Sequence, residues 1–254
     1  MAITYYNIGA INSDRGRPEE AIRYFTEAAS RFEQQHLEGN LAQVYNSMSG
    51  VNWKIDNYRS ALKYNGMALR LARKTGMDNL IPEIYFNRGL ILLDQGNDKE
   101  AIRYIQLSID KGKSTENMNV VCEALLVLGK HAQEQKQYNI AETYFIQAMD
   151  FAHRSGFTRE MKLSKIARIK LKLITKDTTS LYRQISEIAI PANDTQIRIG
   201  DRDALTIRAE YAAIAGEKDT AIMYYMQLVE LLDTMLNCNM LEQFAEMQTR
   251  YETE

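Results

Sequence analysis

A spacing of 40 residues recurs along the whole chain and restricts the folds that it can adopt. One series of mostly small residues reads Ala21, Ala61, Ala101, Ala141, Leu181 and Ala221. A second series lies upstream of the first in each period and reads Gly9, Ser49, Gly89, Gly129, Ile169 and Ala209. Self-similarity at such a period is the signature of architectures in which each unit packs against its neighbours. The sequence therefore predicts six units in phase, of which the fifth, at about 158–190, is degenerate.

The third unit shows what each unit contains. Tyr85 and Gly89 would share one face of a first helix that ends near Gly96. A second helix would then place Ala101 and Ile105 on one face at helical spacing. Gly89 and Ala101 are small where two helices must nearly touch, so we expect both to be tightly packed between the helices of this unit.

Proline and glycine residues mark the expected helix boundaries. Pro18 and Pro82 stand where a first helical turn should begin, a position at which proline is tolerated. Gly76 and Gly156 follow Arg- and Lys-containing helix ends, as C-terminal caps do. Pro191 predicts a break between units five and six.

The pattern resembles the tetratricopeptide repeat family. The best-matching positions are Tyr5, Ile8, Gly9, Gly16, Ala21, Phe25 and Ala28 in the first unit, and Leu128, Gly129, Ala141, Phe145 and Ala148 in the fourth. The resemblance implies an all-α fold, a right-handed α-solenoid of about six helix pairs followed by a long C-terminal helix. The period departs from the family's usual unit of about 34 residues. We expect the second helix of each pair to carry the difference, as about two extra turns.

The domain organisation follows from the register. The solenoid is predicted to cover residues 1–234, with units at about 2–38, 39–78, 79–117, 118–157, 158–192 and 196–234. A capping or linker helix is predicted over 235–254, within one long helix or two nearly continuous ones. The chain enters a first-helix pattern at once and stops inside a helical pattern, so we expect it to be a fragment of a longer protein.

Bulk properties and missing motifs argue against several functions. A net charge of −2 provides no cationic track for nucleic acid, and no apolar run approaches the ~18 residues that span a bilayer. The three histidines share no metal-ligand spacing, and neither a phosphate-binding loop nor a nucleophile elbow occurs. Cys122 and Cys238 lie about three repeats apart, so no disulfide is expected between them. We therefore predict no enzyme, no cofactor and no metal site.

Function is expected in a groove lined by the first helices, as the resemblance implies. The predicted groove residues are Tyr6, Asn7, Asn46, Trp53, Phe86, Asn87 and Leu90. Trp53 and Phe86 would be aromatic anchors for a partner; the alternative is that both pack between neighbouring helices. Asn7 and Asn87 occupy a position that bonds the ligand backbone in peptide-binding relatives, and an amide both donates and accepts. The cationic clamp that some relatives use for a C-terminal carboxylate is missing, since Glu83 has the wrong sign.

These observations predict a scaffold that recognises a protein or peptide. The C-terminal sequence FAEMQTRYETE resembles the segment that closes the repeat domain of Bacteroidetes-type membrane-anchored regulators. This resemblance implies the sensory or interaction domain of a bacterial signalling or transcription regulator, located in the periplasm. The alternative is a cytoplasmic scaffold, or a regulator that responds to a signalling peptide. The apolar stripe of the C-terminal helix must be covered, either by unit six or by a second copy of the chain, which would form a homodimer.

Overall fold

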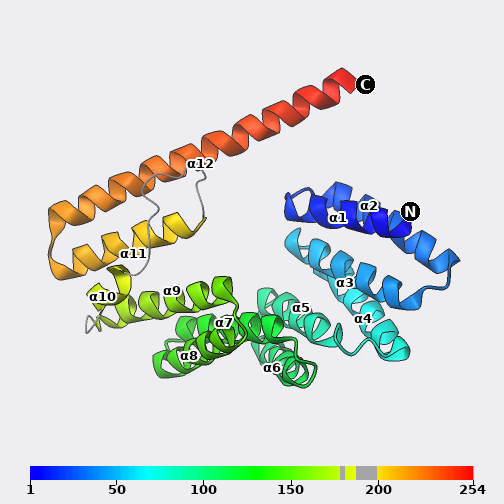
Figure 1. Cartoon of the computed structure of the whole chain (residues 1–254), viewed down its shortest axis with the longest axis horizontal. Coiled ribbons are helices and arrows are strands. Elements are labelled where there is room, and N and C mark those ends of the chain that lie inside the picture. Colours follow the sequence, from blue (N-terminus) through cyan, green and yellow to red (C-terminus); the bar gives the residue numbers. More distant parts are fainter. Residues whose placement is uncertain (178–180, 187–198, 254) are drawn as a thin grey trace. The chain divides into compact units, whose positions relative to one another are not determined.

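A computed structural model describes residues 1–177, 181–186 and 199–253, and this part of the chain is helical and contains no strand (Figure 1). The helices are α1 (Ala2–Asp14), α2 (Pro18–Gln34), α3 (Glu38–Lys54), α4 (Tyr58–Thr75), α5 (Ile81–Asp94), α6 (Asp98–Ser114), α7 (Met118–Glu134), α8 (Tyr138–Arg154), α9 (Thr158–Thr175), α10 (Leu181–Ser186), α11 (Ile199–Ala215) and α12 (Lys218–Thr253). They pair in sequence order, which confirms the predicted fold class. The predicted break at Pro191 lies outside the described residues.

Left-handed backbone at helix ends sets the period. Positive φ angles occur at Gly16, His36, Asp56, Gly76, Gly96, Glu116, Lys136, Gly156, Lys176 and Gly216. Most of these positions follow one another by 20 residues, so one helix and its turn take half of the 40-residue unit. The second helices span 17 or 18 residues, but the first helices α3 and α7 also span 17. Our expectation that the second helix alone carries the added length was therefore wrong for the second and fourth repeats, where both helices share it, whereas in the third repeat α5 has 14 residues and α6 has 17.

The predicted helix boundaries are confirmed where the structure describes them. Pro18 and Pro82 lie in the first turns of α2 and α5, where a missing backbone N–H costs no helical hydrogen bond. Gly76 caps α4 with φ of 68°, and Gly156 has φ of 71° after α8. Glycine suits these positions because it adopts positive φ without a Cβ clash.

The two helices of a pair touch at the small residues that define the register. Ala101 is fully buried, and a Cβ added to Gly89 would lie 3.2 Å from the Ala101 carbonyl oxygen and 2.5 Å from Ile105 Cγ1. In the second unit, Ser49 replaces the glycine and its hydroxyl donates a hydrogen bond to the Ala61 carbonyl at 2.9 Å. The expected tight packing of Gly89 and Ala101 is confirmed.

Tyrosine pairs join the two helices of a pair in the first three repeats. Ring centroids lie 6.2, 5.8 and 6.0 Å apart in the pairs Tyr5–Tyr24, Tyr45–Tyr64 and Tyr85–Tyr104. Offset or tilted ring pairs at this separation add about 0.5–1.5 kcal/mol beyond the area that they bury. Their recurrence at every fortieth residue shows that packing, as well as backbone, follows the repeat.

The chain forms two compact units, Met1–Lys162 and Leu163–Glu254. In the first, each second helix packs against the next first helix, and α1, α3, α5 and α7 also contact one another in turn. The second helices α2, α4, α6 and α8 make no such contacts with one another. Close packing on one side only bends the row, so the first helices line its inner, concave face.

The second compact unit, Leu163–Glu254, has its own core. Side chains of α9, α10 and α11 bury one another, including Ile169, Leu173, Leu181 and Ile207. The helix α12 has 36 residues and packs on α11, which has 17. It is unbroken, one of the two forms expected from the sequence. None of the described helices is long and apolar enough to cross a membrane.

Candidate peptide groove

A hollow of about 400 Å³ opens on the concave face of the first unit. The helices α1, α3 and α5 contribute to it, together with the loops before α5 and α7. Its lining residues are Tyr6, Gln43, Asn46, Ser47, Met77, Asn79, Leu80, Glu83 and Asn117. Amide, hydroxyl and carboxyl groups therefore face a space that also has apolar walls.

Hydrogen bonds link equivalent first helices across this face. The Tyr6 hydroxyl lies 3.2 Å from the Ser47 hydroxyl, between α1 and α3. The Asn87 amide donates to the Asn46 side-chain oxygen at 3.0 Å, between α5 and α3. In both bonds the partners are 41 residues apart, which is one repeat period plus one residue, because neighbouring repeats present the same helix face.

The Asn46 side-chain oxygen accepts a hydrogen bond, but its nitrogen has no acceptor in the part of the chain that the structure describes. Asn46 is only 8% exposed, and its oxygen is occupied by Asn87. Its nitrogen donates no hydrogen bond to any described residue, although Asn46 lines the hollow. The nitrogen atom itself is not sealed from water, so a carbonyl of an incoming ligand would replace water as its acceptor.

The other predicted groove residues occupy different places. Trp53 is half-buried at the end of α3, and its indole N–H donates to the Asp94 carboxylate at 2.6 Å, which ties the second unit to the third. Asn7 is exposed, Leu90 is half-buried, and Phe86 is only 9% exposed. Of the seven predicted residues, the hollow brings together Tyr6 and Asn46, with Asn87 behind Asn46. The roles of all seven remain predictions.

Two groove carboxyl groups were not chosen from the sequence. Burial raises the pKa of Glu83 above its usual value, and a hydrogen bond from Asn117 lowers it in part. Burial also raises the pKa of Glu123, the equivalent residue one unit on; Arg159 lowers it, and the charges of Glu160 and Glu83 raise it further. The signal was present, since both glutamates occupy the same inward position 40 residues apart.

Comparisons with known proteins agree with this geometry. Two tetratricopeptide repeat models match residues 1–74 and 82–110. These two stretches carry tetratricopeptide repeats. These matches cover the first two units and part of the third, which include the helices that line the hollow.

Solved structures with the same fold are distant in sequence. BtubC from P. vanneervenii shares 15% identity at a TM-score of 0.71, with 87% of this chain and 91% of that chain covered. The pilF protein of Pseudomonas aeruginosa shares 16% identity at a TM-score of 0.64, with 95% and 96% covered. The apo form of RapI shares 15% identity at a TM-score of 0.70, and the match covers 89% of this chain but 63% of RapI. No curated protein matches the sequence. At this identity the likeness extends to the fold of the repeats alone.

The thiol within the repeats is buried. Cys122 on α7 is free and fully buried, and burial raises its pKa to about 11. The side chain of Cys238 lies outside the described residues, so the predicted absence of a disulfide remains a prediction. Among the described side chains, no group of three His, Cys, Asp or Glu residues is placed to hold a metal ion.

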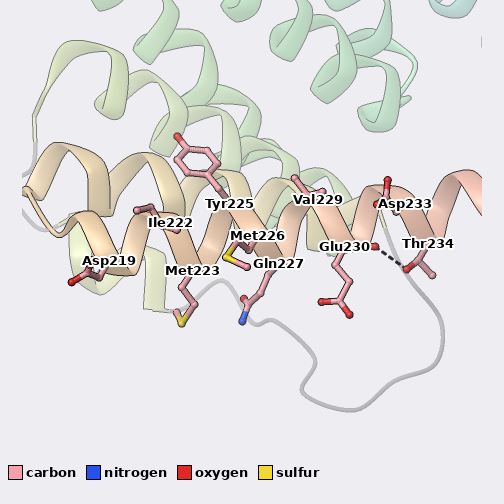
Figure 2. A pocket seen from close by; sticks show the side chains of 10 residues that line it. All are labelled: Asp219, Ile222, Met223, Tyr225, Met226, Gln227, Val229, Glu230, Asp233 and Thr234. Atoms are coloured by element: carbon pink, nitrogen blue, oxygen red, sulfur yellow. Dashed lines mark hydrogen bonds between the residues drawn. The ribbon is translucent and has the colours of Figure 1, made fainter.

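A second surface of note is the exposed face of α12, shown in Figure 2. Large apolar side chains recur along successive turns, and they include Ile222, Tyr225, Met226, Val229, Leu232 and Leu236. Tyr225, Val229 and Leu232 are 43%, 57% and 43% exposed. This face is therefore a nearly continuous apolar stripe that is exposed to solvent.

The repeat register explains why this face is apolar. The positions equivalent to Tyr225, Val229 and Leu232 in the third unit are Ile105, Ile109 and Gly112, which are all buried. There Ile105 packs against Gly89 of its own helix pair, and the next first helix covers the end of the face, since a Cβ added to Gly112 would lie 2.8 Å from Val121. The exposed face of α12 thus keeps the chemistry of an inter-repeat contact, whereas terminal repeats usually present a polar outer face.

Proposed function

We propose that the concave face of the first unit recognises a protein or peptide segment without catalysis. The Asn46 amide N–H, which lines a polar hollow and has no acceptor among the described residues, is the observation that carries this proposal. A peptide backbone supplies carbonyl acceptors at regular spacing, and the apolar walls formed by Met77 and Leu80 would contact its side chains. The groove residues predicted from the sequence, from Asn7 to Leu90, would extend the contact along the first helices.

Within this proposal, the chain is the sensory or interaction domain of a bacterial signalling or transcription regulator. Similar folds support this context: one is a Rap protein complexed with Competence and Sporulation Factor, at 14% identity and a TM-score of 0.62. Another belongs to a signal transduction ATPase with a tetratricopeptide repeat sensor from Pyrococcus horikoshii, at 14% identity and a TM-score of 0.65. A membrane-anchored parent would place the domain in the periplasm. A free-standing scaffold or signalling-peptide regulator would place it in the cytoplasm.

Peptide selection tests the proposed function. Random twelve-residue peptides displayed on phage would be panned against the protein, and the affinity of selected peptides measured by fluorescence anisotropy. The variant Ser47→Trp, which fills the hollow, should reduce the affinity at least tenfold. The matched variant Arg103→Trp, on the exposed outer surface of α6, should not. Equal binding by both variants, or no selected peptide at all, would contradict the proposal.

A second candidate function is self-association through α12. The exposed residues Ile222, Tyr225, Val229, Leu232 and Leu236 follow one another at three and four positions, the spacing at which two long helices pack in a coiled coil. The helix is also about twice as long as α11, its packing partner. We infer that a second copy of the chain covers this stripe and forms a homodimer.

A further inference from the structure

The strongest unassigned feature is a carboxyl group that has no cation beside it. Glu83 on α5 lines the hollow, and its ionised form is disfavoured by burial. The only group that favours the charged form is the Asn117 amide, which donates a hydrogen bond to it. Glu83 forms no salt bridge with any residue that the structure describes, and no Lys or Arg charge is among the causes of its pKa shift. A charge partly removed from water without a counter-ion is expensive.

The fourth repeat adds a further carboxyl group near Glu83. The charge of Glu83 raises the pKa of Glu123, and the charge of Glu160, a third carboxylate, raises it as well. Arg159 is the one cation that acts on Glu123, and it lies 3.2 Å from the Glu160 carboxylate. Two carboxylates and one guanidinium therefore act on Glu123, and neither carboxylate favours its ionised form.

A separate observation concerns a hydrogen-bond donor on the other wall of the hollow. The Asn46 amide is nine-tenths buried, is fixed by Asn87, and presents an unused donor to the same hollow as Glu83. A donor on one wall and an uncompensated anion on another are complementary to a group that carries both an acceptor and a cation. Tyr6, Met77 and Leu80 provide apolar surface between them.

We propose that this groove selects peptide segments that carry a basic side chain, lysine or arginine. Its cation would pair with Glu83 while a backbone carbonyl of the same segment accepts from Asn46. The aliphatic stem of the basic residue would lie on Met77 and Leu80, as long cationic side chains do on apolar surface. Glu123 attracts a second basic residue further along the segment. This inference rests on the proposed function, whose peptide specificity it names.

Synthetic peptide pools test the selectivity directly. Four pools of acetylated and amidated heptapeptides would be compared, with random flanks and a central arginine, lysine, citrulline or glutamate. Citrulline keeps the shape of arginine but carries no charge. The wild-type protein should bind the arginine and lysine pools at least tenfold more tightly than the citrulline pool, and should bind the glutamate pool least. Raising the salt concentration should reduce the arginine preference, because the contact is electrostatic.

Two variants assign the preference to Glu83. Glu83→Gln should reduce the ratio of arginine to citrulline binding to near one, while the citrulline pool is still bound. Glu100→Gln, the same exchange on the exposed start of α6, should keep the ratio. Circular dichroism would verify that both variants fold. Spermidine at the concentration of the peptide pool should not displace the bound arginine peptides, because it lacks a backbone carbonyl.

The outcomes separate this inference from the proposed function. Binding of all pools with equal strength would leave peptide recognition standing and overturn the cation selectivity. A preference that survives Glu83→Gln would place the cation elsewhere and also overturn it. Full displacement by spermidine would show that a small polyamine is sufficient to occupy the groove, and it would overturn the selectivity for peptides. Failure to bind any pool would contradict both.

Discussion

Single residues set how closely the repeat helices approach. Gly89→Ala should destabilise the protein by about 1–3 kcal/mol, because the new Cβ would meet Ile105 and the Ala101 backbone in a filled site. Gly66→Ala should stabilise it by about 0.5–1 kcal/mol, because Gly66 lies inside α4 with open space around it and alanine favours helix. Urea unfolding of both variants measures the difference, and shifts of the same sign would contradict the assigned packing.

The buried thiol should be chemically inert. In a Cys238→Ser variant, only Cys122 remains to react. Its pKa of about 11 leaves little thiolate at pH 8, and the side chain is inaccessible to reagent. We expect reaction with Ellman's reagent to be slow in the native protein and complete in urea. Rapid stoichiometric modification without denaturant would mean that α7 is not packed as described.

Glu83 makes stability depend on pH with a definite sign. Its folded-state pKa is raised, so the folded protein holds the proton more tightly than the unfolded chain does. The stabilising effect of the neutral form is complete below the ordinary value of 4.5 and is lost as the pH rises through the folded-state pKa. Glu83→Gln should therefore melt at a higher temperature than the wild type at pH 7, and the difference should shrink towards pH 4.5. A variant that melts lower at pH 7 would show that the ionised carboxylate has a stabilising partner.

At the scale of elements, α12 carries a row of large apolar side chains that are exposed to water. Val229→Lys and Leu232→Lys should shift sedimentation from dimer to monomer, because a lysine in a coiled-coil seam weakens association. The control Gln227→Lys changes charge on the same helix beside the stripe. A wild-type protein that sediments as a monomer at micromolar concentration would contradict self-association.

The helices themselves were largely predictable because their determinants are local. Small residues at Gly89 and Ala101, proline at Pro82 and the turn at Gly76 each act within one unit, and the 40-residue period repeats the evidence. The division of the added length between both helices was missed, because helical sequence continues through both and the exact turn depends on left-handed residues other than glycine, such as Lys136.

The groove was less predictable, because its groups combine across units. The pairing of Asn87 with Asn46, and the unused donor that it leaves, depends on how α5 packs on α3. The raised pKa of Glu83 depends on burial by neighbouring elements and on the hydrogen bond from Asn117. Sequence position indicates that a residue faces inward, but partners and desolvation come from the packed structure.

At the scale of the molecule, the first unit provides a groove and the second provides an exposed helix. The repeats of Met1–Lys162 present donors and carboxylates on one face, where equivalent positions stack from unit to unit. The residues Leu163–Glu254 end in α12 with its apolar stripe. The proposed recognition and the proposed self-association therefore use different residues, and a change in one set can be made without altering the other.

Hydrogen–deuterium exchange with and without a selected peptide tests the central claim most directly. Binding in the groove should slow exchange in α3, α5 and the loops that carry Met77 and Asn117, where the hollow is lined. Exchange in α12 and in the outer helices α2, α4 and α6 should change little. Protection confined to α12, or to the outer helices, would contradict recognition by the concave face.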